Sequence, residues 1–311
     1  MGKPRILVFG EVCKELNLRG CQEKDGVKYS DSYNGEPGGN GLIAAMTLSF
    51  YGNEAVLCSK TGADADGRAI LKYLSSVEMR PGVRTDTRFI TQSSDYHTPL
   101  HISMIYPDRI EKTVCRSPDY SVTVTDVDDA FMIYPDHVVV FDCLSVKAYG
   151  QIASQIERKG GELYIMSCPD EKALSRFGKC TLLSVDEKEA ALLSGIYLKD
   201  QETCMRACMA ISRKIQASYI VIRMSGRGYF IYDGTFYMFV TAYDLPKSMI
   251  NDGDTIFCSV FIHAFIESGG DIKFTCEYAN AASAAYIAGG LESLPDDMEI
   301  RKFAERNGTK L

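Results

Sequence analysis

The chain has 311 residues, of which 46% are hydrophobic and 24% charged, and its net charge is −7 at pH 7. This composition is typical of a globular protein and argues against a disordered, collagen-like or coiled-coil chain. A nucleic-acid binder usually has a basic excess or a basic stripe, and the sequence has neither. No apolar run approaches the roughly 18 residues of a membrane span. We therefore expect neither a nucleic-acid nor a membrane partner.

Eleven cysteines are scattered along the chain, and their number is odd. A chain of this length can build a core without disulfides, so we expect free thiols. The first apolar run, 6–9, is too short for a signal peptide and predicts a buried strand instead. These features indicate a cytoplasmic protein. Cys204 and Cys208 lie four apart with no second zinc-like pair, which predicts a buried helix face rather than a metal site.

Short apolar runs alternate with helical patterns along most of the chain. Runs rich in Val, Ile and Leu suit strands that are covered on both faces. The alternation predicts an α/β fold, a three-layer α/β/α sandwich with a mainly parallel central sheet. The predicted strands are 6–9, 55–58, 138–141, 163–166, 182–185 and 219–222. The predicted helices are 42–51, 65–75, 146–158, 187–193, 202–214, 254–267 and the Ala-rich 274–287.

Two segments interrupt this alternation. Residues about 12–35 are polar and contain several glycines, and residues about 96–116 alternate around a Pro107-Asp108-Arg109 hairpin turn. Together they predict a small antiparallel flap, a β lid over a small-molecule site. His101 lies in the second segment, and the sequence leaves two roles for it: a contact with substrate, or packing. With no linker or repeat, 1–311 is predicted to be one domain with this lid.

Two glycine-containing motifs precede predicted helices. In Pro37-Gly38-Gly39-Asn40-Gly41, the glycines would let backbone amides approach a ligand, and the alternative is a tight loop without a ligand. In the second motif, 62–67, Asp64 or Asp66 is expected to cap the following helix.

Two acidic motifs lie at predicted helix starts. Asn251-Asp252-Gly253-Asp254 would offer an anion hole of backbone amides and a carboxylate that takes a proton from a hydroxyl, or it is an N-cap alone. Asp186 and Glu189 follow a predicted strand, where ligands of parallel sheets usually bind. They would hold Mg²⁺ through water, or they begin a solvated helix.

The order of these motifs resembles that of the PfkB (ribokinase-like) carbohydrate kinase family over nearly the whole chain. The similarity comprises Gly38-Gly39, the 62–67 motif, Asp186-x-x-Glu189, Gly253-Asp254 and the Ala-rich helix. It implies the sandwich with a β lid, the cofactors ATP and Mg²⁺, and phosphoryl transfer to a hydroxyl of a sugar or nucleoside.

The resemblance implies a role for each matching position. Asp254 would be the general base, and the amides around Asn251, Asp252 and Gly253 would hold the transferring phosphoryl group. The residues implied for nucleotide and Mg²⁺ binding are Asp186 and Glu189, which match Asn-x-x-Glu, then Arg223, Ser225, Gly226 and Gly228 in a nucleotide-contacting turn, and Asn280 near adenine.

The same resemblance places the acceptor beside Glu15 and the Gly38-Gly39-Asn40 loop. Glu15 stands where many members have a sugar-binding Asp. Ile43 occupies the position at which members usually have an Asn that contacts substrate hydroxyls.

Several positions depart from the family pattern. The seven residues 248–254 keep only the final Gly-Asp of the usual Asp-Thr-Thr-Gly-Ala-Gly-Asp, and Asp252 adds a negative charge beside the anion hole. Changes at Ser248, Asn251, Ile43 and Arg223 leave an alternative open, a catalytically weak homologue that binds a ligand for regulation. The sequence does not name the acceptor, and a homodimer through the lid is a further expectation.

Overall fold

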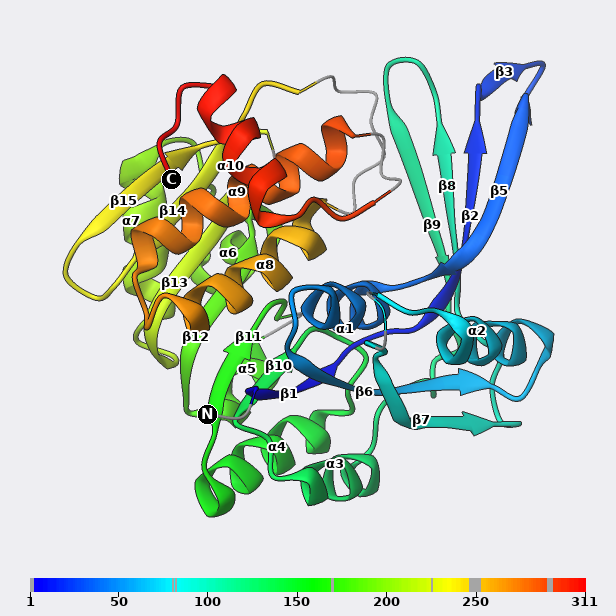
Figure 1. Ribbon diagram of the computed structural model, residues 1–311, viewed down its shortest axis with the longest axis horizontal. Helices are drawn as coiled ribbons and strands as arrows, with labels where there is room; N and C mark the ends of the chain where they lie inside the picture. The colour runs from blue at the N-terminus through cyan, green and yellow to red at the C-terminus, as the bar shows by residue number, and fades with distance from the viewer. Residues whose placement is uncertain are drawn as a thin grey trace.

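A central sheet of nine strands organises the part of the chain that the structure describes (Figure 1). This computed structural model describes residues 3–79, 81, 83–168, 171–224, 226–245, 253–289 and 293–311. From one edge to the other, the strands are β15 (Tyr237–Thr241), β14 (Gly228–Tyr232), β13 (Gln216–Met224), β12 (Lys179–Asp186), β11 (Glu162–Ile165), β10 (His137–Val140), β1 (Arg5–Phe9), β6 (Glu54–Gly62) and β7 (Asp86–Ser93).

The pairs from β13 to β7 are parallel, and β14 and β15 add an antiparallel edge. All six predicted apolar strands are confirmed. They read as continuous apolar runs because their side chains are buried on both faces of the sheet. In β1, Leu7 and Phe9 belong to one apolar core, and Ile6 and Val8 belong to the other. The sequence analysis missed β7 and β15, whose exposed positions break up the apolar pattern, and also β14, although its side chains are almost all buried.

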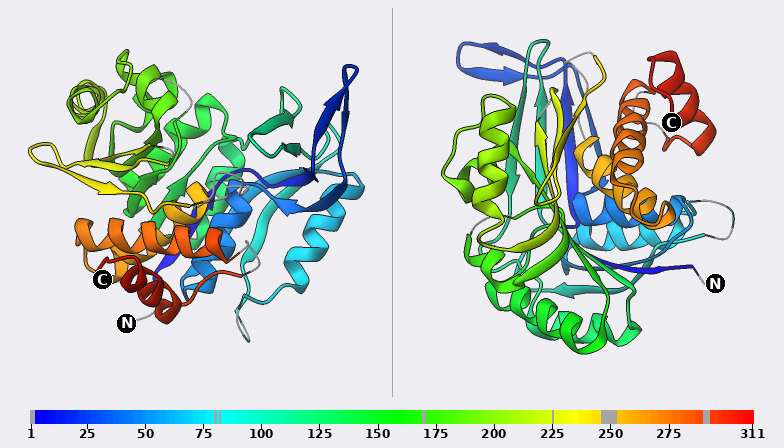
Figure 2. Two further views of the ribbon diagram at one scale, coloured as in Figure 1. Left: turned by 90° about the horizontal axis from the view of Figure 1, so that it is seen from above. Right: turned by 90° about the vertical axis from the view of Figure 1, so that its left-hand side faces the viewer.

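Helices cover both faces of the sheet and form the outer layers of the predicted sandwich (Figure 2). One face carries α1 (Asn40–Phe50), α2 (Ala65–Ser76), α8 (Gly253–Glu267), α9 (Ile272–Ala288) and α10 (Asp297–Arg306). The other face carries α3 (Val124–Ala130), the 3₁₀ turn η1 (Phe131–Ile133), α4 (Val146–Lys159), α5 (Glu171–Phe177), α6 (Glu187–Ser194) and α7 (Gln201–Ile211). The sequence analysis missed α5 and α10 and extended α7 three residues too far.

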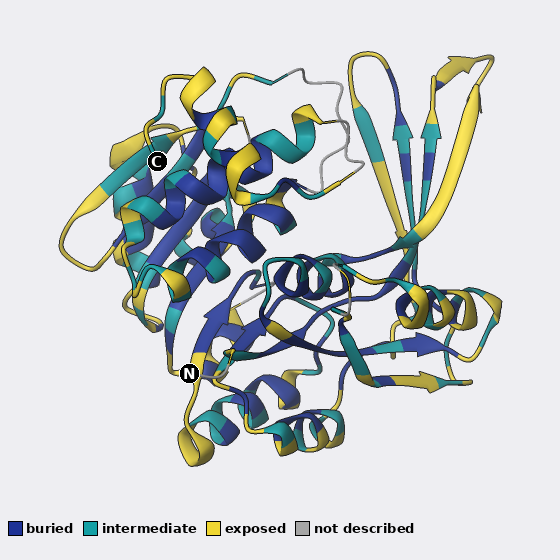
Figure 3. Ribbon diagram, viewed as in Figure 1, coloured by how far each residue is buried: buried dark blue, intermediate teal, exposed yellow. Residues whose placement is uncertain are grey.

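A second sheet projects from the core and forms the lid (Figure 1). Its strands, in order, are β5 (Ser32–Gly38), β2 (Cys13–Arg19), β8 (Leu100–Ile105) and β9 (Ile110–Cys115), and a hairpin of β3 (Gln22–Lys24) and β4 (Val27–Tyr29) extends it. Both predicted lid segments supply these strands. The expectation of a purely antiparallel flap was wrong, because β2 and β8 pair in parallel where the two segments meet. Most of β5 is exposed (Figure 3).

All eleven cysteines lie among the described residues, and none of them forms a disulfide, as predicted. Cys204 and Cys208 are fully buried on one face of α7, which confirms their packing role. None of the described helices combines the length and the apolar character that crossing a membrane requires.

Candidate functional site beneath the lid

Glu11 lies just after β1, at the carboxyl edge of the parallel sheet where the lid joins the core. Its side chain is only 1% exposed. Its Oε2 lies 2.7 Å from Arg116 Nη1 and accepts a hydrogen bond from the Cys143 thiol at 3.2 Å. Its Oε1 contacts Nε2 of His101 on lid strand β8. A buried carboxylate thus connects the lid to the core.

Asn40, the first residue of α1, connects the ends of β1 and β10. Its Oδ1 accepts from the Glu11 backbone N–H at 2.9 Å, and its Nδ2 donates to Asp142 Oδ1 at 2.9 Å. The preceding Gly39 has φ +98°, and a Cβ there would lie 2.5 Å from the Glu11 carbonyl oxygen. Only glycine fits this approach, so the tight loop holds Asn40 in place.

The glycine loop also contacts Glu15 on lid strand β2. The Gly39 N–H donates to Glu15 Oε1 at 3.1 Å, and a Cβ on Gly38 would lie 2.4 Å from Glu15 Cδ. The structure therefore brings Glu15, Gly38, Gly39 and Asn40 together, as the resemblance implies. Ile43, one turn further along α1, is partly buried against the apolar core.

Charges around Glu11 set the protonation of this cluster. Burial alone would raise the pKa of Glu11, but His101, Cys143 and Arg116 outweigh it and lower that pKa. Burial, followed by the charge of Glu11, raises the pKa of Asp142. The cluster thus holds one firmly ionised carboxylate and a second that takes up a proton more readily.

The second part of the site lies at the start of α8. Gly253 is buried, and its carbonyl accepts from Ser283 Oγ of α9 at 2.8 Å, which fixes this end of the helix. Asp254, in the first turn, is exposed although most of α8 is buried. The predicted anion-hole residues Asn251 and Asp252 lie outside the described residues, as does Ser248.

Asp186 and Glu189 form a capping box at the start of α6. The Glu189 N–H donates to Asp186 Oδ1 at 2.7 Å, and the Asp186 N–H donates to Glu189 Oε2 at 2.8 Å. Glu189 Oε1 also accepts from the Cys168 N–H at 3.0 Å and from the Ser167 hydroxyl. The helix-start reading is therefore confirmed, although Glu189 is mostly buried rather than solvated. Burial, above all, raises the pKa of Glu189.

Arg223 pairs in register with Asp186 across β12 and β13 and is 8% exposed. Its Nη1 donates to the Met166 carbonyl at 3.2 Å and to Ser184 Oγ at 2.8 Å, and its Nη2 lies 3.8 Å from Glu189 Oε2. Burial alone would lower its pKa, but the surrounding acidic groups outweigh that effect and raise it; they are Cys258, Asp254, Glu189 and Asp186. The structure thus gathers Asp186, Glu189, Arg223 and Asp254 into one charged region.

The predicted nucleotide-contacting turn connects β13 and β14. Gly228 has φ +132°, and a Cβ there would lie 2.0 Å from the Val240 carbonyl, so this position requires glycine. Gly226 is exposed with φ +72°, and Ser225 lies outside the described residues. Asn280 of α9 is buried and donates to the Thr241 carbonyl at 2.9 Å, so its expected place near adenine stays a prediction.

The sequence analysis did not assign a role to Glu11, Arg116, Asp142 or Cys143. Glu11 follows the residue after β1, and Asp142 follows the predicted strand 138–141, so both lie at the carboxyl edge where ligands of parallel sheets bind. Their position just after a predicted parallel strand, the same criterion that singled out Asp186, would have identified both residues. Arg116 joins them only through the lid pairing, which no local pattern in the sequence reveals.

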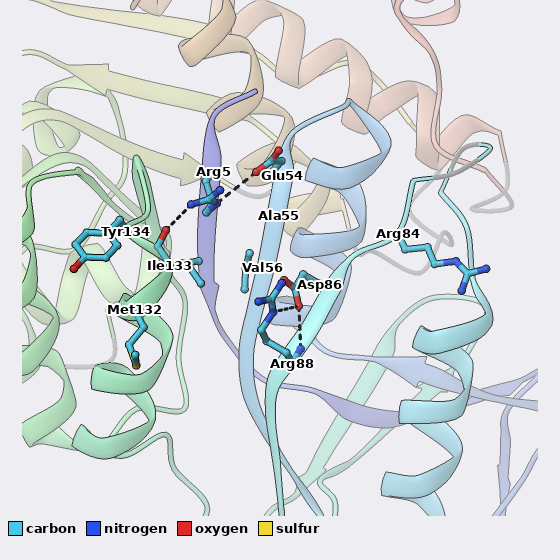
Figure 4. A pocket seen from close by; sticks show the side chains of 10 residues that line it. All are labelled: Arg5, Glu54, Ala55, Val56, Arg84, Asp86, Arg88, Met132, Ile133 and Tyr134. Atoms are coloured by element: carbon cyan, nitrogen blue, oxygen red, sulfur yellow. Dashed lines mark hydrogen bonds and ion pairs between the residues drawn. The ribbon is translucent and has the colours of Figure 1, made fainter. Parts of the chain in front are cut away.

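A hollow of about 600 Å³ lies at the opposite edge of the sheet, between β1, β6, β7 and η1 (Figure 4). Its arginines all have acidic partners: Arg5 with Glu54, Arg88 with Asp86, and Arg84 with Glu78. Its charges are therefore largely neutralised, and it lacks the convergent groups of the region beneath the lid.

The three layers, the β lid and the charged clusters at the carboxyl edge define a ribokinase-like α/β protein. Solved structures share this fold. The Arabidopsis thaliana ribokinase complexed with ribose and ATP superposes with a TM-score of 0.78 at 16% identity, over 97% of this chain and 99% of that one. Phosphofructokinase-2 of Escherichia coli gives a TM-score of 0.75 at 15% identity, over 98% and 99%.

The model of the pfkB family of carbohydrate kinases matches residues 3–293. The chain belongs to this family.

Curated relatives include the bifunctional protein HldE of Campylobacter concisus, 23% identical over 258 residues, and the bifunctional ribokinase/ribose-5-phosphate isomerase A of Fructilactobacillus sanfranciscensis, 25% identical over 275 residues. The alignments cover 81% and 86% of this chain. They span only 52% and 49% of those relatives.

Proposed function

We propose that this protein transfers the γ-phosphoryl group of ATP to a hydroxyl of a sugar or sugar-like molecule bound beneath the lid. The observation that carries the proposal is Asp254, an exposed carboxylate in the first turn of the otherwise buried helix α8. Helix α8 packs against α1, which begins at Asn40 in the cluster beneath the lid. Both helices thus contribute their first residues to the proposed site.

In this proposal the acceptor contacts Glu15, Gly38, Gly39 and Asn40, with Glu11 and Asp142 beside them and Ile43 as an apolar neighbour. Asp254 takes the proton of the acceptor hydroxyl while the oxygen of that hydroxyl bonds to the γ-phosphorus. The bond between that phosphorus and the β–γ bridging oxygen breaks, and ADP leaves. The amides around Asn251, Asp252 and Gly253 stabilise the charge on the transferring group.

ATP and Mg²⁺ fit the second part of the site. Carboxylate oxygens of Asp186 and Glu189 suit Mg²⁺, which would neutralise phosphate charge when bound. Glu189 already accepts three hydrogen bonds, so it suits a contact through water better than direct coordination. The positive charge of Arg223 would stabilise these carboxylates. Ser225, Gly226 and Gly228 would contact the nucleotide.

The test is phosphoryl transfer measured as ADP release with a panel of sugars and nucleosides. The variant Asp254→Asn should lower kcat by about 10²–10⁴-fold, because the amide cannot accept the proton. The matched control, Glu267→Gln, removes an exposed carboxylate at the other end of the same helix and should keep full activity. Unchanged turnover in Asp254→Asn would contradict the assignment. Binding of a sugar with no response to any nucleotide would favour the regulatory homologue.

A further inference from the structure

Three metal-ligating side chains meet where the lid joins the core. They are Glu11 after β1, Cys13 at the start of β2 and His101 on β8. One ligand atom of each residue lies within 4.8 Å of the others. Glu11 and Cys13 are buried, and the side chain of His101 is 30% exposed.

Two of these atoms, Glu11 Oε1 and His101 Nε2, form a buried ion pair that joins the core to the lid. Within the described part of the chain, neither atom has a hydrogen-bond partner beyond this contact. A carboxylate oxygen and an imidazole nitrogen that face each other, with the Cys13 thiol beside them, form a donor set that a cation between them would bind.

A second triad shares Glu11 and adds Asp142 and Cys143. The Arg116 guanidinium already contacts that triad, because its Nη1 lies 2.7 Å from Cys143 Sγ and from Glu11 Oε2. The same guanidinium nitrogen is 3.6 Å from Asp142 Oδ2. The described structure thus places Arg116 against Glu11 Oε2 and leaves Oε1 facing His101.

We propose that Glu11 Oε1, Cys13 Sγ and His101 Nε2 bind a transition-metal ion of the Zn²⁺ class. Thiolate and imidazole ligands select such ions, whereas Mg²⁺ prefers oxygen alone. Three protein ligands leave a fourth, tetrahedral position for water or another oxygen ligand. Tetrahedral ligands lie roughly 3.3–3.8 Å apart at the usual metal–ligand lengths, so His101 needs only a small movement away from Glu11.

The local charges balance when the ion is bound. Cys13 must lose its thiol proton to solvent, and His101 must bind as the neutral imidazole with any second ring proton also released to solvent, because the thiolate and the neutral imidazole are the ligands. One divalent ion and Arg116 then face the carboxylates of Glu11 and Asp142 and the Cys13 thiolate, so three positive charges meet three negative ones. The bound ion would tie lid strand β8 to the core. The proposal concerns binding alone and does not depend on the kinase activity.

The experiment is titration of the full chain with Co²⁺, a spectroscopic probe for Zn²⁺ sites, in a buffer without chelators or thiols. We expect one Co²⁺ per chain, a near-ultraviolet thiolate-to-cobalt charge-transfer band, and displacement by Zn²⁺ but not by excess Mg²⁺. Cys13→Ser should abolish the band, and His101→Gln should weaken Co²⁺ binding at least tenfold.

Two control variants separate this site from the other thiols and histidines. Cys115→Ser changes an exposed cysteine at the end of β9, and His97→Gln changes a lid-side histidine whose side chain is 93% exposed. Both should bind Co²⁺ as the unmodified chain does. If Cys13→Ser fails to fold, His101→Gln alone decides. Absence of the band in the unmodified chain, or equal Co²⁺ affinity in His101→Gln and His97→Gln, would overturn the proposal.

Discussion

At the scale of single residues, Asn40 shows how one side chain can position a site. Its two amide atoms face opposite partners, a backbone donor at Glu11 and a carboxylate acceptor at Asp142. Asn40→Asp replaces the donor with an oxygen that repels Asp142. We expect a loss of about 1–3 kcal/mol in the free energy of unfolding, measured by urea denaturation at pH 7.

The matched control for this change is Asn34→Asp, on exposed lid strand β5. It introduces the same charge without a buried partner, so its stability should stay within about 0.5 kcal/mol of the unmodified chain. Equal losses in the two variants would mean that net charge, rather than the Asn40 bridge, controls stability.

Asp64, the N-cap of α2, predicts an acid-dependent stability. Burial alone would raise its pKa, but hydrogen bonds from the Gly67 N–H at 2.8 Å and from the N–H and hydroxyl of Thr98 at 2.8 and 2.7 Å lower it to about 2. The ordinary value is 3.8. The carboxylate therefore contributes stability that is full above about pH 4 and is lost as the pH falls toward 2.

Asp64→Asn should cost about 1 kcal/mol at pH 6, and the cost should shrink at pH 3. The measurement is urea denaturation at both pH values, with Asp95→Asn, an exposed change in the nearby 94–99 loop, as the control. A cost that stays constant or grows toward pH 3 would contradict the assigned sign.

At the scale of elements, the β13–β14 turn depends on a glycine that packing requires. In Gly228→Ala, the new Cβ meets the Val240 carbonyl at 2.0 Å, and φ +132° is strained for alanine. The antiparallel edge of the sheet must then shift, so we expect a loss of roughly 3 kcal/mol or more in stability.

Gly234→Ala, in the next turn between β14 and β15, separates the two causes. Its φ is +94°, but its Cβ would meet no atom within 4 Å. Backbone strain alone should cost about 1–2 kcal/mol there. Urea denaturation of both variants measures the difference, and equal losses would mean that the clash with β15 contributes nothing.

At the scale of the whole molecule, the sequence predicted the layers better than the connections between them. Buried runs such as Val138–Val140 identify central strands because neither face reaches water. The edge strands β7 and β15 were missed because their exposed positions dilute that signal. The parallel pairing of β2 with β8 joins segments over 80 residues apart in sequence, and periodicity within either segment carries no information about it.

Some residues of the candidate site can likewise be predicted from local sequence patterns, and others cannot. Asp254, Asp186 and the glycine loop lie at helix starts, which short sequence patterns can locate. Arg116 and His101 reach Glu11 only because the lid folds over the core, so their roles depend on long-range pairing. The long-range contacts therefore had to come from the structure.

The whole molecule should also report its ligands through thermal stability. A ligand that binds only the folded state at about 100 times its Kd adds roughly 2.7 kcal/mol, a rise of several degrees in Tm. We expect a nonhydrolysable ATP analogue with Mg²⁺ to raise Tm, and one sugar in the panel to raise it further. Asp254→Asn should retain both shifts although its turnover falls, because the base acts on the proton rather than on binding. If the ATP analogue no longer raised the Tm of that variant, the role of Asp254 would be ligand binding rather than proton transfer.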